Sequence, residues 1–190
     1  MTVPQRVLDT MNSGLIYTCD DEEMIKAQKE QMELLYDFNA TRPSQMTQRN
    51  EIARQLLGEF GEDAYIEPPL HANWGCNTYF SAHAYANFNL TLVDDGEVHI
   101  GEHTMIGPNC TIITTGHPIR PDLREKVTQY SLPVTIGRNV WLGANVTVLP
   151  RRHHWRQFGD WRMLAGCQRY SRQCGRIRTA MQGVSRNRRT

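Results

Sequence analysis

The chain has 190 residues, which is enough for one domain, or for one domain with a small helical attachment. No apolar run approaches the roughly 20 residues that span a bilayer, and residues 1–10 lack the apolar centre of a secretory signal. We therefore expect a cytoplasmic protein without a membrane partner. The five cysteines form no CxxC pair, so the sequence predicts neither a zinc site nor a disulfide framework.

The net charge of +1 hides a sharp division along the chain. Residues 151–190 contain eleven Arg, no Lys and one acidic residue, Asp160, which gives +10. Residues 1–150 therefore carry ten basic and nineteen acidic groups, which gives −9. A single evolved domain rarely divides its charge in this way, so the C-terminal segment needs an explanation of its own.

Two amphipathic helices are predicted near the N-terminus. In the first, at 20–38, Asp20 is the expected N-cap and Glu23 completes a capping box. The second runs from Ser44 to Phe60 and is expected to stop at Gly61. Helices with one apolar face usually pack against another element, and neither helix carries chemistry of its own.

A six-residue repeat begins further along the chain. Aliphatic residues, most of them followed by glycine, recur at this spacing in two blocks: Ile100, Ile106 and Ile112, then Ile136, Leu142 and Val148. The pattern is typical of a parallel β-helix, in which the aliphatic residue points inward and the small residue permits the tight turn. We therefore predict a mainly β protein, with a helical segment at 1–62 and a β-helix at 63–150.

The segment from Ile113 to Pro133 interrupts this repeat. It contains the sequence TTGHPIRPDL and is predicted to be a loop that leaves the coil between the two blocks. Loops held by a rigid scaffold often carry functional residues, so we expect chemistry here.

Several stretches resemble the maltose and galactoside O-acetyltransferases and the related nodulation acetyltransferases. They are YIEPP (65–69), YANFNLTLVDD (85–95), IGPNCTIITTGHP (106–118) and PVTIGRNVWLGANVTVLP (133–150). The resemblance implies a left-handed β-helix, an exception to the usual right-handed crossover. It also implies a homotrimer with active sites between subunits, acetyl-CoA as co-substrate with no bound cofactor or metal, and a sugar hydroxyl as acetyl acceptor.

The resemblance assigns the general base to His117 in TGHP. A sugar hydroxyl must lose its proton as it attacks a thioester, and a neutral imidazole is suited to take that proton at physiological pH. Without the motif, His117 would be interpreted as an ordinary solvated loop residue.

Acceptor contacts are assigned in the same way to Asn87, Asp95 and Asp20, with Asp21 as the alternative to Asp20. An amide and a carboxylate suit a polyol, because sugar hydroxyls need both donors and acceptors. Ordinary turn or capping roles are the alternative for these residues. Asn73 stands where relatives often have Ser or Asp, so the identity of the sugar stays open.

Two further assignments concern the acetyl donor. The backbone N–H of Ala144 corresponds to the group that stabilises the oxyanion of the tetrahedral intermediate. Trp141 corresponds to a residue that contacts the pantetheine arm or the acceptor, and a place in the trimer interface is the alternative.

Residues 151–190 do not continue the repeat. Reading the codons one base later would convert Trp155 and Trp161, each followed by Arg, into glycines six residues apart. The shifted frame can then read GVTIGDNSVIGA across 151–162, close to VTIGRNVWLGA at 134–144. We therefore interpret 151–190 as a non-native, frameshifted tail that replaces the last coils.

Three alternatives differ in function class. An Arg-rich tail with interspersed aromatic residues could bind nucleic acid, although the sequence contains no nucleic-acid-binding motif. Loss of the last coils would remove coenzyme A contacts, which makes an inactive or pseudogene product the main alternative. A metal-dependent carbonic anhydrase on the same kind of helix would need three converging ligands from four histidines: His83, His99, His103 and His117.

Overall fold

The computed structural model describes residues 3–150 and a short strand at 153–154. Apart from that strand, the predicted non-native tail at 151–190 lies outside the described residues, and both it and the division of the chain at 62 and 150 stay predictions. Within the part of the chain that is described, no helix is long and apolar enough to cross a membrane.

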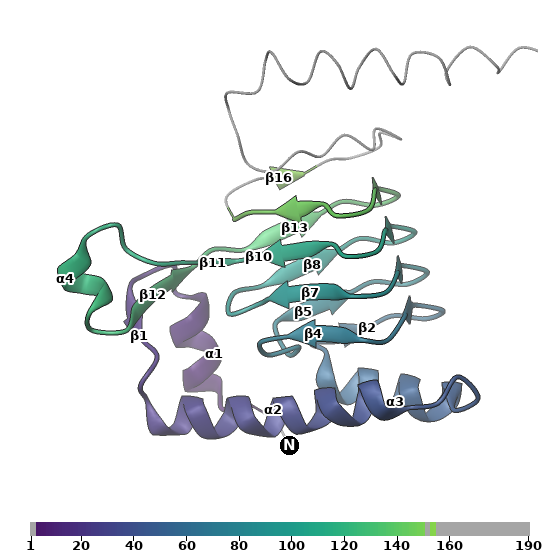
Figure 1. Ribbon diagram of the computed structural model, residues 1–190, viewed down its shortest axis with the longest axis horizontal. Helices are drawn as coiled ribbons and strands as arrows, with labels where there is room; N and C mark the ends of the chain where they lie inside the picture. Colours follow the sequence, from purple (N-terminus) through teal and green to yellow (C-terminus); the bar gives the residue numbers. More distant parts are fainter. Residues whose placement is uncertain (1–2, 151–152, 155–190) are drawn as a thin grey trace, which may run out of the picture.

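From residue 59 onward the chain winds into a left-handed parallel β-helix with three faces (Figure 1). Sheet 1 consists of β2 (Glu59–Phe60), β5 (Thr78–Phe80), β8 (Val98–Ile100), β13 (Val134–Ile136) and β16 (His153–His154). Sheet 2 consists of β3 (Tyr65–Ile66), β6 (Tyr85–Ala86), β9 (Met105–Ile106) and β14 (Trp141–Leu142). Sheet 3 consists of β4 (Leu70–Ala72), β7 (Leu90–Val93), β10 (Thr111–Ile113) and β15 (Thr147–Val148). Each coil takes one strand from each sheet in turn, which confirms the predicted fold class.

The aliphatic residues of the repeat form buried columns inside this helix. Ile106 lies between Ala86 and Leu142 in the register of sheet 2, and all three are buried. The other two sheets contribute equivalent columns, in which every member is also buried: Phe80, Ile100 and Ile136 in sheet 1, and Leu92, Ile112 and Val148 in sheet 3. Stacked coils therefore bury one continuous apolar core, as repeat proteins do.

The glycines of the repeat are required by the spacing between coils. A Cβ atom on Gly101 would lie 2.6 Å from the carbonyl carbon of Gly137 on the next coil. Gly101 has no positive φ, whereas His103 and Asn109, residues of types that tolerate the left-handed region, do. The prediction that the small residue permits a tight turn is therefore corrected: it permits neighbouring coils to approach closely.

Partners on successive coils are usually 20 residues apart, as for Thr91 and Thr111. This separation is two residues longer than three hexapeptides. The two extra residues lie between sheets 3 and 1, where Asp94 and Asp95 are found. Across the predicted loop the separation is 36 residues, from Thr111 to Thr147. The loop thus adds 16 residues at the same corner without a change of register.

Three helices precede the β-helix: α1 (Gln5–Asn12), α2 (Glu22–Ala40) and α3 (Met46–Leu56). Helices α2 and α3 lie across the base of the β-helix, and α1 lies near β12 (Figure 1). The side chain of Asn39 on α2 donates to the carbonyl oxygen of Leu70 and accepts from its N–H, both at 2.8 Å. This amide satisfies part of the free edge of β4, which would otherwise be open to association.

The two predicted helices are present, but their ends differ from the prediction. The N-cap of α2 is Asp21, whose Oδ1 accepts from the Met24 N–H at 2.9 Å, so the predicted cap at Asp20 is wrong by one residue. Helix α3 ends before Gly61, because Phe60 belongs to β2 and pairs with Phe80. Helix α1 was not predicted.

The predicted loop is confirmed and contains structure of its own. Its elements, with the N-terminal strand that joins them, are β11 (Thr115–Gly116), α4 (Pro121–Arg124), β12 (Thr128–Ser131) and β1 (Tyr17–Thr18). Strand β12 pairs in antiparallel fashion with β11 on one side and with β1 on the other. The loop therefore joins the N-terminal segment to the β-helix (Figure 1).

Candidate active site

Three segments meet at the corner between sheets 3 and 1, which we call the Asp95 corner. They are residues 73–77, residues 94–96 and the loop at 114–133. The first two occupy the same corner on successive coils, and the loop is the expansion of that corner on the next coil. The candidate site is built from these segments.

Asp94 holds the first two segments together. It is fully buried, and its carboxylate accepts from the N–H groups of Trp74 and Gly75 and from the Thr78 hydroxyl at 2.7–3.0 Å. Burial raises the pKa of Asp94 to about 6, although these donors oppose the rise. Asp94 has a structural role, because it fixes the backbone of residues 73–77.

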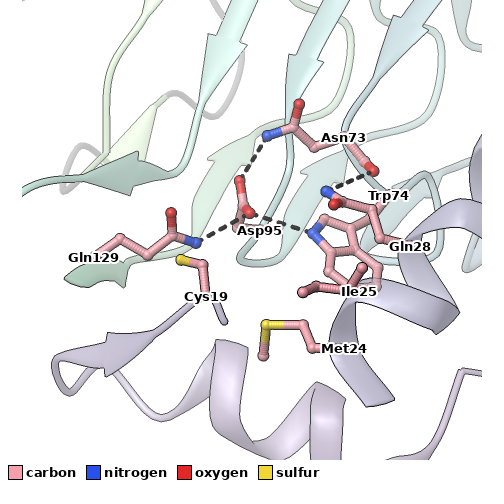
Figure 2. Close-up of a pocket in the computed structure, with 8 residues that line it drawn as sticks. All are labelled: Cys19, Met24, Ile25, Gln28, Asn73, Trp74, Asp95 and Gln129. Carbon is pink, nitrogen blue, oxygen red and sulfur yellow. Dashed lines mark hydrogen bonds between the residues drawn. The ribbon is translucent and has the colours of Figure 1, made fainter. Parts of the chain in front are cut away.

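Asp95 connects all three segments. Its Oδ1 accepts from Trp74 Nε1 at 3.2 Å and from Gln129 Nε2 at 3.1 Å. Its Oδ2 accepts from Asn73 Nδ2 at 2.9 Å and from the Thr115 hydroxyl at 2.8 Å. Figure 2 shows Asp95 between Asn73, Trp74 and Gln129. Asp95 is 6% exposed, so these bonds take the place of most of the hydration that a free carboxylate would have.

The N-terminal segment enters the same network through Tyr17. Gln129 Nε2 also donates to the Tyr17 hydroxyl at 2.6 Å, and this hydroxyl lies 3.0 Å from Ser131 Oγ. Burial raises the pKa of Tyr17 to about 12, so the phenol is neutral at physiological pH and can donate to Ser131. Side chains as well as backbone bonds therefore hold β1 against β12.

A pocket of about 180 Å³ lies between this network and α2 (Figure 2). It is lined by Cys19, Met24, Ile25, Gln28, Asn73, Trp74, Asp95 and Gln129. Apolar side chains with a few convergent polar groups are typical of small-molecule sites, which usually enclose about 300–1,000 Å³. The pocket of a single chain is smaller than that, and it suits one part of a larger ligand.

His117 follows β11 on the loop that carries Gln129, and its side chain is exposed. Its Nδ1 lies 3.0 Å from the carbonyl oxygen of Thr128. A carbonyl oxygen only accepts, so in the neutral ring Nδ1 carries the proton and Nε2 keeps its lone pair. This is the tautomer that a general base acting through Nε2 requires. His117 does not itself line the pocket.

The other predicted site residues lie at a second corner, between sheets 2 and 3, which we call the Asn87 corner. Asn87 follows β6 there, and Ala144 follows β14, the strand that contains Trp141. The Asn87 side chain accepts a local bond from the Phe88 N–H at 2.7 Å. Within the described residues, the Ala144 N–H has no hydrogen-bond acceptor. One chain therefore presents the predicted site residues as two separate groups.

Neither N-terminal acid is brought into the pocket. Asp20 is exposed, and its neighbour Cys19 lines the pocket instead. Asp21 caps α2 and pairs with Arg6 at 2.8 Å. The capping bond from Met24, more than the Arg6 guanidinium, lowers the pKa of Asp21.

The four histidines that a metal enzyme would draw on do not form a three-ligand group in the described part of the chain. Among residues 3–150, no three metal-ligating side chains converge. His83 and His103 stack with ring centroids 4.8 Å apart and occupy left-handed turn positions. Stacking and turn geometry therefore explain why histidine occurs at both positions. His99 stacks on Tyr79 at 4.7 Å.

Sequence reasoning missed three members of the Asp95 network: Tyr17, Trp74 and Gln129. Trp74 could have been found from the sequence, because it adjoins Asn73, which stands where relatives often have Ser or Asp. Tyr17 and Gln129 lie outside the repeat on short strands, and no periodicity points to either.

Residues 10–61 match the maltose acetyltransferase hexapeptide capping motif. The galactoside O-acetyltransferase of Lactococcus lactis is 47% identical over 136 residues, which cover 71% of this chain and 66% of that protein. The galactoside O-acetyltransferase of Escherichia coli K12 is 37% identical over 142 residues, which cover 75% of this chain and 70% of that protein. The chain thus spans just under two thirds of the first relative and slightly more of the second.

Similarity extends to solved structures. A galactoside acetyltransferase in complex with coenzyme A superposes with a TM-score of 0.71 at 37% identity. The match covers 79% of this chain and 73% of the other.

The His117 tautomer can be tested without any substrate. We expect ¹⁵N–¹H correlation spectra of the histidine rings at neutral pH to show a protonated Nδ1 and an unprotonated Nε2 for His117. The physical reason is the carbonyl oxygen of Thr128, which can only accept. A dominant Nε2–H form in these spectra would contradict the assignment, and His71, an exposed strand residue, is the reference.

Proposed function

This chain belongs to the maltose and galactoside O-acetyltransferase family of hexapeptide-repeat proteins, and we propose that it transfers an acetyl group from acetyl-CoA to a sugar hydroxyl, with His117 as general base. The observation that carries the proposal is the bond from His117 Nδ1 to the Thr128 carbonyl, which leaves Nε2 free to accept a proton. The reaction takes place in the cytoplasm, with a neutral sugar of the galactoside or maltose type as acceptor.

The proposed reaction is direct transfer without an acetylated enzyme. His117 Nε2 removes the proton from the acceptor hydroxyl as its oxygen attacks the thioester carbonyl. The tetrahedral intermediate places a negative charge on the former carbonyl oxygen, to which the N–H of Ala144 donates. Collapse of the intermediate expels the coenzyme A thiolate, and the His117 imidazolium returns the proton to it. No step requires a metal.

The separation of the two corners supports a homotrimer. Asp95 and His117 lie at one corner, whereas Asn87, Trp141 and Ala144 lie at another, so a complete site joins the first corner of one subunit to the second corner of its neighbour. Exposed apolar side chains occur near both corners: Ile119 on the loop at 92%, and Phe88 and Met105 at 49% and 54% near Asn87. Such head-to-tail contacts form a ring when the rotation closes.

Acceptor recognition is assigned to both corners. Asn87 contributes from one subunit, and the pocket beside Asp95 contributes from the next. Asp20, which is exposed next to that pocket, can reach only a part of the acceptor that extends beyond it. Trp141 lies beside the Ala144 turn, where the pantetheine arm would pass.

Replacement of His117 by alanine should remove most of the acetylation in a form whose C-terminus is restored by in-frame reading. General-base catalysis typically contributes about 10²- to 10⁴-fold, and we expect kcat to fall by that factor while the oligomer persists. The measurements are steady-state kinetics and sedimentation. Near-normal turnover would show that another group takes the proton, and His71→Ala is the matched control.

A mixture of two inactive variants tests the shared site. In the form with the restored C-terminus, coexpression of His117→Ala chains with Asn87→Ala chains should restore about one quarter of the activity of that form, because random association creates interfaces in which both residues are intact. The activity of each variant expressed alone stays low. A mixture with no gain over the separate variants would place all the site residues in one subunit.

The main alternative, an inactive product, follows from the tail at 151–190, which lies outside the described residues. Its charge of +10 beside −9 for residues 1–150 favours an out-of-frame origin. On this proposal the present chain lacks coenzyme A contacts, and calorimetric titration should show weak or no binding of acetyl-CoA. Micromolar affinity would overturn the frameshift proposal, and an in-frame reconstruction that binds acetyl-CoA would support it.

A further inference from the structure

We propose that Arg124 is a positioning residue for His117, because its guanidinium holds the backbone that directly follows the general base. The inference rests on the proposed function, since it concerns how that base is kept against the Thr128 carbonyl. No role for Arg124 was expected from the sequence.

Strand pairing alone does not fix the place of His117. The last paired residue of β11 is Gly116, opposite Tyr130, and residues 117–120 belong to no helix or strand. The acceptor of the imidazole, the Thr128 carbonyl, lies at the start of β12, on the other side of the excursion that contains α4 (Figure 1). The contact between the base and its acceptor therefore depends on bonds within this excursion.

Arg124, at the end of α4, supplies such bonds. Its Nη1 donates to the carbonyl oxygen of Pro118 at 3.0 Å and also to that of Ile119. These are the two residues directly after His117, and a carbonyl oxygen can only accept. The guanidinium is planar and always charged, so one nitrogen with two hydrogens holds both carbonyls in a defined arrangement. Arg124 therefore fixes the path of the chain as it leaves the imidazole.

The same helix is also tied to the acceptor of the imidazole. The Thr128 hydroxyl donates at 2.8 Å to the carbonyl oxygen of Leu123, the neighbour of Arg124. Together with the bond from His117 Nδ1 to the Thr128 carbonyl, these contacts close a ring that begins and ends at His117. Removal of the Arg124 side chain opens this ring beside the base, whereas Thr128 stays in β12, paired with Thr18. The expected effect therefore falls on the imidazole.

A second arginine of the loop makes different contacts. The side chain of Arg120 is 74% exposed, and its guanidinium pairs with Asp122 at 2.5 Å. Within the described residues, that guanidinium donates to Asp122 alone. Arg120→Ala therefore removes an equal charge from the same loop without opening the ring, which makes it the matched control for Arg124→Ala.

The first test uses the full chain and needs no substrate. Histidine-ring ¹⁵N–¹H spectra of Arg124→Ala at neutral pH should show His117 in both tautomers, because the ring is no longer held with Nδ1 against the Thr128 carbonyl. Arg124→Lys should recover part of the Nδ1–H signal, since an ammonium can donate to a carbonyl but lacks the planar fork. Arg120→Ala should give the unmodified spectrum. Arg124 is exposed, so its replacement leaves no cavity in the core.

The second test measures turnover in the form with the restored C-terminus. A small misplacement of a catalytic group can cost about 10²-fold, so Arg124→Ala should lower kcat about ten- to a hundredfold. Arg124 does not line the pocket, so KM for the acceptor should be unchanged. Adding Arg124→Ala to His117→Ala should cause no further loss, because a residue that acts through the base has no effect once the base is gone.

Two results would overturn the inference. An unchanged His117 spectrum in Arg124→Ala would show that the imidazole keeps its tautomer without the guanidinium. An equal loss of kcat from Arg124→Ala in the presence and in the absence of His117 would show a general structural role. Near-normal turnover of His117→Ala would contradict the proposed function instead, and the ring spectra would still decide whether Arg124 orients the imidazole.

Discussion

The burial of two adjacent carboxylates at one corner of the coil is the constraint on which the site depends. Asp94 and Asp95 are 0% and 6% exposed, and a buried charge is costly unless hydrogen-bond donors surround it. The donors come from residues 73–78 and from the loop, so the two carboxylates determine how these segments lie together. Gln129 extends the network to the N-terminal strand, because its amide also donates to the Tyr17 hydroxyl. The apolar columns hold the coils, whereas this demand for donors shapes the pocket.

The scaffold is fixed by bonds within one chain, whereas the proposed site also depends on contacts between chains. Hydrogen bonds between coils fix the two corners within one rigid body, and neither corner can approach the other. A reaction that needs both can then be completed only by a neighbouring copy, whose position is set by surface contacts. In the proposed trimer, the precision of the site depends on assembly as much as on folding.

The sequence predicted the coil well, because inward aliphatic residues at a spacing of six leave a direct trace in the chain. The loop was predicted from the break in that spacing. Helix ends were predicted less accurately, since either Asp20 or Asp21 can cap the helix and only the geometry of the turn selects Asp21. The link of Tyr17 to Gln129 could not be predicted, because a two-residue strand has no periodicity. The tautomer of His117 likewise depends on the carbonyl of Thr128, which only the folded loop brings close.

The uneven coil has a consequence for how such proteins can vary. Between sheets 3 and 1 the chain takes 8 residues from Leu92 to Ile100 and 24 from Ile112 to Ile136, yet the strands on both sides keep their register. A single residue inserted between Ile100 and Ile106 would instead turn an inward side chain outward. Length at the Asp95 corner is therefore free to change while the scaffold stays constant. Descendants of one ancestral coil could acquire different acceptors by lengthening or trimming this corner alone.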